Sequence, residues 1–188
     1  MLELNDVLLQ GERHTLSMMA REGELTCLTA TPFMGQAVGD GGRWLHAILG
    51  FEPVVAGYIS IDGEPITSAT LPAMRRLMAY APATLDSVGE LTVYEPPSVQ
   101  DVFALKANRQ QPITNGILSE EMKRTGTVGM KAQLLAVAVL LNRPILLIDS
   151  PDAASSAYLR RLADDGRTVI VVSNADEIVH EADNVVEV

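Results

Sequence analysis

Residues 143–151 read Arg-Pro-Ile-Leu-Leu-Ile-Asp-Ser-Pro, in which four large aliphatic residues lie between prolines and are followed by a carboxylate. This pattern is typical of a β-strand whose two faces are both buried. A strand of that kind lies in the interior of a sheet. We therefore expect Asp149 to emerge at the carboxyl edge, where open α/β sheets bind their ligands.

The segments around this strand extend the pattern. Residues 134–141 are apolar throughout and, with their flanks, predict a buried helix. Residues 153–162 predict another helix, and residues 168–172 (Thr-Val-Ile-Val-Val) predict a second buried strand. Helix, strand, helix and strand at this spacing predict an α/β fold with a mostly parallel sheet that is flanked by helices.

The N-terminal part predicts antiparallel β-structure. Residues 2–9 and 15–20 have strand-like sequences, and Gly11-Glu12 between them is typical of a hairpin turn. A further strand is expected at residues 57–63, where Tyr58, Ile59 and Ile61 precede an Asp-Gly turn.

A short amphipathic helix is expected next, at residues 71–78, with Thr70 as its N-cap. Residues 78–81 predict a short strand. From residue 86 to residue 127 the sequence is broken by Pro and Gly, and Ser98 with Asp101 resembles a capping box that opens a helix. We interpret this stretch as a short helical insertion.

A glycine-rich segment follows the apolar strand predicted at residues 25–29. Residues 30–42 contain Gly35, Gly39, Gly41 and Gly42, and apolar residues at helical spacing begin at Trp44. Strand, glycine-rich loop and helix form the geometry in which free backbone N–H groups cradle phosphate. The alternative is a plain surface loop, which the residues alone favour modestly.

Charge and composition exclude several kinds of partner. The net charge is −10, and the first hundred residues contain no lysine. This argues against nucleic acid and against an anionic membrane surface as direct partners, since both need clustered cations. No signal peptide or membrane-spanning run is visible, so we expect a cytoplasmic protein without membrane insertion. The single cysteine, Cys27, lies in an apolar run and is expected to be a small buried residue.

An ordered series of short motifs extends over nearly the whole chain. It comprises Gly23-Glu24 before a strand, Leu49-Gly50 with Pro53, Arg75-Arg76 before residues 77–83, the strand and turn at 145–151, Ser173 to Asp176 after a strand, and Ala182 to Val188. This series resembles the nucleotide-binding domain of ATP-binding cassette (ABC) transporters. The resemblance implies a P-loop NTPase-like domain over residues 1–188. Its parts are a β part with a P-loop-like core (1–85), a reduced helical subdomain (86–127) and a C-terminal core (128–188).

The positions that carry chemistry in that family differ here. The resemblance places Gly41 at the lysine of the phosphate loop and Gly42 at its serine or threonine, with Arg43 as the nearest cation. The acidic residue that helps to hold Mg²⁺ is kept as Asp149. The family's glutamine corresponds to Ala83, its general-base glutamate to Ser150 and its switch histidine to Asn174. The signature sequence aligns with residues 126–130 and keeps one of its two glycines.

These substitutions lead to a specific expectation. A serine hydroxyl cannot accept a proton from water at neutral pH as a carboxylate can. We therefore expect no catalytic residues and no metal site; any cofactor contact would come from Gly41, Gly42, Arg43 and Asp149. For Asp149, holding the loop is favoured over binding a metal.

The resulting hypothesis is an ABC-type domain that does not hydrolyse ATP and acts as a structural or regulatory subunit. The resemblance implies ATP and Mg²⁺ as ligands, although no cofactor is expected from these residues. It also implies a membrane permease, a second ABC-type subunit or a second copy as partner, at the inner face of the membrane. One alternative is an active ATP-binding subunit that uses partner residues. Another is a stand-alone protein that binds a different small molecule near Asp149 and Asn174.

Overall fold

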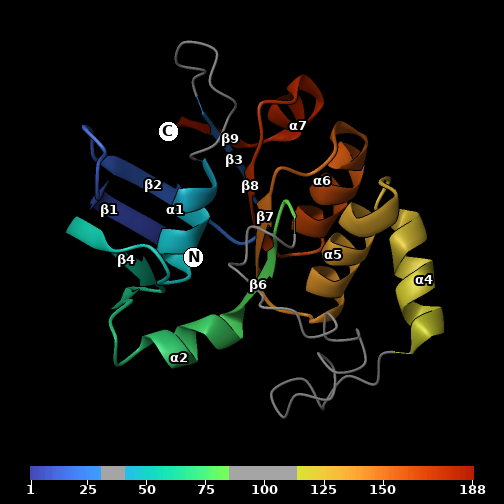
Figure 1. Cartoon of the computed structure of the whole chain (residues 1–188), viewed down its shortest axis with the longest axis horizontal. Helices are drawn as coiled ribbons and strands as arrows, with labels where there is room; N and C mark the ends of the chain where they lie inside the picture. The colour runs from blue at the N-terminus through green and yellow to red at the C-terminus, as the bar shows by residue number, and fades with distance from the viewer. Residues whose placement is uncertain (31–40, 85–113) are drawn as a thin grey trace.

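The computed structural model describes residues 1–30, 41–84 and 114–188, and its framework is a pair of sheets (Figure 1). The larger sheet has the strand order β6-β7-β8-β3-β9, and each neighbouring pair runs parallel. Its strands are β3 (Leu25–Thr29), β6 (Met78–Ala81), β7 (Ile145–Asp149), β8 (Thr168–Val172) and β9 (Asn184–Glu187). The predicted α/β class with a parallel sheet is confirmed.

Strand β7 lies inside this sheet, between β6 and β8. Ile145 and Leu147 pack into one hydrophobic core, which β7 shares with α1 and the smaller sheet. Leu146 and Ile148 pack into a second core on the opposite face, against the helices. All four side chains are at most 3% exposed, so each contributes roughly 1.5–3 kcal/mol of hydrophobic stabilisation. The aliphatic run is therefore buried on both faces, as predicted.

The smaller sheet is antiparallel, with the strand order β2-β1-β4-β5. Its strands are β1 (Leu2–Leu9), β2 (Leu16–Ala20), β4 (Val54–Ile61) and β5 (Glu64–Pro65). Strand β4 begins three residues before the predicted start at Gly57. The reason is a bulge in β1: at Gly57, which has φ +74°, a Cβ would lie 2.3 Å from the carbonyl oxygens of Asn5 and Asp6. Glycine lets the strand continue past this close approach.

Helices cover both faces of the parallel sheet. They are α1 (Gly41–Ile48), α2 (Leu71–Met74), α4 (Asn115–Arg124), α5 (Gly129–Leu140), α6 (Ser156–Asp164) and α7 (Asp176–Glu181), with 3₁₀ turns η1 (Arg75–Leu77) and η3 (Ala153–Ser155). Figure 1 shows α1 on the side of the antiparallel sheet, α5 and α6 on the opposite side, and α4 outside them. Trp44 of α1 is 4% exposed and anchors that helix in the first core, as predicted.

Two local predictions need correction. Thr70 precedes α2, but its side chain makes no capping bond to that helix. Its hydroxyl instead donates to the Pro65 carbonyl oxygen and accepts from the Thr67 N–H, because a short polar side chain competes for nearby backbone groups. The helix expected at 71–78 is also divided into α2 and η1.

The helical insertion is described only in its last part. Helix α4 lies within the range 86–127, and Thr114 caps it through a bond from the Ile117 N–H to the Thr114 hydroxyl. Ser98 and Asp101, the predicted capping box, lie outside the described residues.

Candidate functional site

Asp149 is the last residue of β7 and Ser150 follows it, so both lie at the carboxyl edge of the parallel sheet. The Ser150 N–H donates to the Val172 carbonyl oxygen at 3.0 Å, so the turn after β7 is tied to the end of β8. Ser150 has φ +48°, a left-handed conformation that is uncommon for residues other than glycine. In this turn the Ser150 hydroxyl donates to Asp149 Oδ1 at 2.9 Å. The serine therefore orients the carboxylate beside it.

Helix α1 begins against the same edge, and its first two residues have no side chains. A Cβ built on Gly41 would lie 2.3 Å from Val172 Cγ1, and a Cβ on Gly42 would lie 2.8 Å from Asp149 Oδ2. Real Cβ atoms do not approach other atoms this closely. A lysine at position 41, or a serine or threonine at position 42, would therefore require the side chain of Val172 or Asp149 to move. In the present conformation, the side chains of Val172 and Asp149 occupy the space beside these two glycines.

Asn174 lies just beyond β8 and bonds to Ala30, the residue that follows β3. Its Nδ2 donates to the Ala30 carbonyl oxygen at 2.7 Å, and its Oδ1 accepts from the Ala30 N–H at 3.1 Å. The amide side chain thus makes a two-point contact with one residue's backbone, at the entrance to the glycine-rich segment. Only a side chain with both a donor and an acceptor makes this pair of bonds.

Lys131, near the start of α5, holds the turn after β7 from another side. Its Nζ donates to the Ser150 carbonyl oxygen at 2.9 Å and to Asp152 Oδ1 at 3.0 Å. The Thr127 hydroxyl donates to the other oxygen of Asp152. The Thr127 bond, followed by the Lys131 bond, keeps the pKa of Asp152 below its usual value. The sequence interpretation missed this cluster, although Lys131 is one of only three lysines and lies next to the signature-like segment.

The other predicted site residues lie as follows. Arg43 forms ion pairs with Glu12 (3.0 Å) and Glu52 (2.5 Å), and it also donates to the Gln10 carbonyl oxygen. Ala83 is half-buried beyond the end of β6 and carries only a methyl group. The structure thus brings Gly41, Gly42, Asp149 and Ser150 together, whereas the guanidinium of Arg43 is engaged by two carboxylates. Residues 31–40 of the predicted loop lie outside the described residues.

The described part of the chain leaves little space beside Ser150. The cavity that touches Asp149 and Ser150 has a volume of about 10 Å³, at the lower limit for one water molecule. Within residues 1–30, 41–84 and 114–188, no group of three or more His, Cys, Asp or Glu side chains is placed to hold a metal ion. In the same ranges, no helix is long and apolar enough to cross a membrane.

Comparison with known proteins rests on structure. A scan against protein-family models finds no match, and neither does a search of curated proteins. Among solved structures, an ATP-binding subunit of an ABC transporter superimposes with a TM-score of 0.70 over 100% of this chain and 85% of its own, at 19% identity. The chain has the fold of an ABC transporter ATP-binding subunit. Identity this low shows the fold alone.

Two further structures share this ABC fold. A bacterial Atm1-family ABC exporter with ATP bound matches 100% of this chain and 36% of its own, with a TM-score of 0.70 and 16% identity. CbiO1 from Clostridium perfringens, part of the ABC transporter complex cbiONQ, matches 99% of this chain and 83% of its own, with a TM-score of 0.66 and 16% identity. The resemblance inferred from the ordered motifs is confirmed at the level of the fold. The division at residues 85 and 127 stays a prediction.

Proposed function

We propose that this chain is an ABC-type subunit that does not hydrolyse ATP and that serves a structural or regulatory role in a transport complex. The observation that carries this proposal is the packing of Gly41 and Gly42 against Val172 and Asp149. In the ABC fold, position 41 corresponds by motif to the lysine that meets the phosphates, and position 42 to the hydroxyl that helps to hold Mg²⁺. Neither side chain is present, and either one would need the side chain of Val172 or Asp149 to move.

The residues that remain at this edge also lack catalytic chemistry. The position of the general base is Ser150, whose hydroxyl donates to Asp149 and is a poor proton acceptor at neutral pH. The position of the switch histidine is Asn174, whose amide bonds to the Ala30 backbone. ATP and Mg²⁺ would therefore lack these partners at this edge of the sheet. Arg43 does not replace the lysine, because its guanidinium forms ion pairs with Glu12 and Glu52.

Phosphate release tests the proposal directly. The purified chain with ATP and Mg²⁺ should release inorganic phosphate no faster than the Asp149→Ala variant does. The matched control is Glu64→Ala, which removes an exposed carboxylate on β5 and should behave like the parent chain. Phosphate release that is lost in Asp149→Ala and kept in Glu64→Ala would overturn the proposal. It would favour the alternative, an active ATP-binding subunit.

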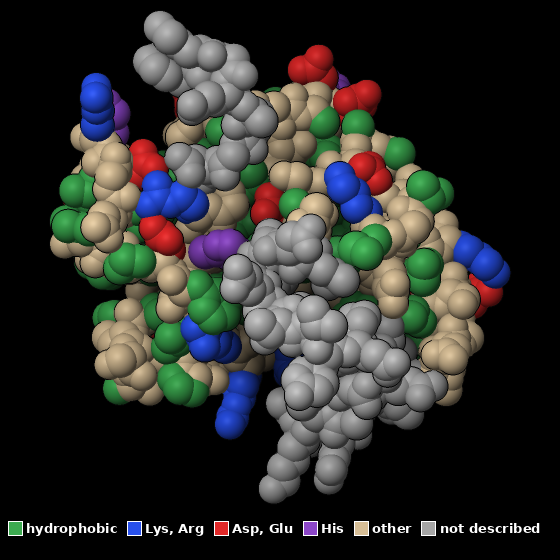
Figure 2. Space-filling view, in the orientation of Figure 1, with side chains coloured by type: hydrophobic (Ala, Val, Ile, Leu, Met, Phe, Trp, Pro, Cys, Tyr) green, Lys and Arg blue, Asp and Glu red, His purple; other side chains and the backbone are tan. Residues whose placement is uncertain are grey.

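The partner proposal is a membrane permease or another ABC-type subunit, with a second copy of this chain as a further candidate. CbiO1 is described as part of a transporter complex, and an ABC subunit without catalysis needs a partner to act on. Figure 2 shows basic side chains scattered over one face and several of them beside acidic ones, which supports the prediction that nucleic acid is not a ligand. A permease partner would place the chain at the inner face of the membrane.

Cell fractionation tests this placement. The chain in its own cells should sediment with the membranes and be released by alkaline carbonate, as expected for a peripheral subunit. A chain that stays entirely in the soluble fraction contradicts the permease proposal, whatever the outcome of the phosphate assay.

A further inference from the structure

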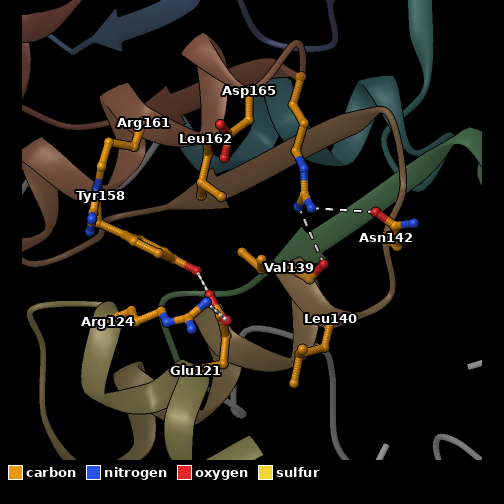
Figure 3. A pocket seen from close by; sticks show the side chains of 10 residues that line it. Glu121, Arg124, Val139, Leu140, Asn142, Tyr158, Arg161, Leu162 and Asp165 are labelled. Atoms are coloured by element: carbon orange, nitrogen blue, oxygen red, sulfur yellow. Dashed lines mark hydrogen bonds and ion pairs between the residues drawn. The ribbon is translucent and has the colours of Figure 1, made fainter. Parts of the chain in front are cut away.

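A second cavity lies at the opposite edge of the parallel sheet from Asp149. It has a volume of about 360 Å³, within the range of small-molecule sites, and lies between α4, the end of α5 and α6 (Figure 3). Asn142 and Arg167, which line it, precede β7 and β8, whereas Asp149 and Asn174 follow those strands. A ligand in this cavity would be separated by the length of the strands from Asp149 and Asn174 at the carboxyl edge.

Part of the cavity wall is apolar. Val139, Leu140 and Leu162 line it, and Figure 3 shows the ring of Tyr158 lying along one side. The Tyr158 hydroxyl donates to Glu121, and burial, reinforced by this bond, raises the pKa of Tyr158. The phenol therefore stays protonated and keeps donating to Glu121. These surfaces offer contact to the body of a ligand that is itself apolar.

The charged residues of the wall favour a single negative charge. Three arginines and two carboxylates, Glu121 and Asp165, line the cavity in a protein whose net charge is −10. Glu121 is already satisfied, since it accepts from both Tyr158 and Arg124. Arg124 is 67% exposed, and its bond to Glu121 is long at 3.5 Å. Its guanidinium therefore has donors to spare for a ligand.

The other two arginines are held in place while keeping further donors. Arg167 donates to the Val139 carbonyl oxygen at 3.3 Å and to Asn142 Oδ1 at 3.4 Å. Arg161 lies over the ring of Tyr158, with its guanidinium carbon 5.7 Å from the ring centre. A guanidinium has five N–H donors in a planar fork that matches a carboxylate.

We propose that this cavity binds a small organic monoanion, a carboxylate on an apolar body, through Arg124 and the neighbouring arginines. The excess of one positive charge matches one carboxylate, while the two acidic side chains would repel a dianion. The apolar wall accepts a ring or a short aliphatic group. Because α4 and α6 contribute opposite walls, an occupied cavity would also hold α4 against the core.

Titration of the ¹⁵N-labelled chain with sodium benzoate tests the proposal. Saturable amide shifts are expected at residues 121–124, 139–142 and 158–167, with a dissociation constant on the order of 1 mM. Benzamide, the neutral analogue, should bind at least about fivefold more weakly, because it lacks the charge that the arginines recognise.

Two variants separate this site from a general charge effect. Arg124→Gln should weaken benzoate binding about five- to tenfold, the typical effect of losing one charged hydrogen bond. Arg76→Gln, which removes an exposed arginine from η1, should leave binding unchanged. Circular dichroism checks that both variants are folded. If Arg124→Gln fails to fold, Arg161→Gln takes its place with the same expected result. Equal binding of benzamide, an unchanged dissociation constant in the arginine variant, or no saturation up to about 10 mM overturns the proposal.

Discussion

Gly41 and Gly42 show how the absence of side chains can define a site. Helix α1 approaches β7 and β8 so closely that a Cβ at Gly41 would meet the Val172 side chain and a Cβ at Gly42 would meet the Asp149 carboxylate. The same closeness brings the helix start to the carboxylate of Asp149. At the scale of single residues, the first two positions of α1 place backbone, without side chains, beside Val172 and Asp149.

Gly41→Ala should destabilise the fold by about 1–3 kcal/mol, the usual cost of overpacking. The added methyl group would lie 2.3 Å from Val172 Cγ1, and that side chain is buried in the core. The matched control is Gly116→Ala in α4, where the new methyl would lie 3.7 Å from the Thr114 hydroxyl oxygen, an ordinary contact distance. The control should be neutral or stabilising by up to about 1 kcal/mol. Urea unfolding of both variants measures the difference, and equal stabilities would contradict the close packing at Gly41.

Asn174→Asp should cost about 1–3 kcal/mol of stability. The aspartate can still accept from the Ala30 N–H, but it cannot donate to the Ala30 carbonyl oxygen and would place a negative charge beside it. Asn174→Ala removes both bonds without repulsion and should cost less. Urea unfolding again measures the effect. An aspartate variant as stable as the parent would show that the bond to the Ala30 carbonyl oxygen contributes nothing.

At the scale of elements, the turn after β7 is held from three sides. The strand β8 binds the Ser150 N–H, the carboxylate of Asp149 binds its hydroxyl, and Lys131 at the start of α5 binds its carbonyl oxygen. The same lysine pairs with Asp152 two residues further on. The start of α5 and the end of β7 are therefore joined by polar contacts in addition to the core between them.

The contribution of this junction should depend on pH. The pKa of Asp152 is lower in the folded chain than the value of about 3.9 expected for an unfolded one. Its stabilising effect is therefore complete above that value and is lost as the pH falls through the folded pKa. Because Asp152 is 40% exposed, the effect is screened and small. The difference in unfolding free energy between the parent and Asp152→Asn should be constant near neutral pH and shrink below about pH 4. A difference that grows in acid contradicts the assignment.

The sequence predicts these elements better than the contacts between them. The aliphatic run at residues 145–148 identified β7 because burial on both faces leaves a clear compositional signal. The predicted end of that strand also placed Asp149 and Ser150 correctly at the carboxyl edge of the parallel sheet. The Asn174 contact with Ala30 joins residues 144 positions apart and depends on one rotamer, so no local pattern predicts it. Thr70 lies at the predicted N-cap position of α2, but its hydroxyl donates to the Pro65 carbonyl oxygen and makes no capping bond, which the local sequence does not indicate.

At the scale of the whole molecule, one parallel sheet separates two hydrophobic cores. Strand β3 lies between β8 and β9 and carries the single cysteine on the face that packs against the helices. Cys27 is fully buried, and its thiol donates to the Ser173 carbonyl oxygen at 3.4 Å. Burial, offset in part by that bond, raises the pKa of Cys27 to about 11.

The reaction rate of the Cys27 thiol should therefore measure how often the parallel sheet opens. At about pH 8, a free thiol is substantially reactive, whereas this one is both protonated and inaccessible. The native chain should react with a disulfide reagent only as fast as it unfolds, and the urea-unfolded chain should react at once. Reaction of the native chain at the unfolded rate would show that β3 is exposed by local motion.

The position of β3 also bears on how the chain is made. This strand is translated early, yet its two neighbours come from residues 168–172 and 184–187. During synthesis on the ribosome, β3 has neither partner until β8 leaves the exit tunnel, and its second edge stays unpaired until β9 follows. A nascent chain that stalls before residue 184 would therefore leave one edge of β3 unpaired and able to pair with other chains.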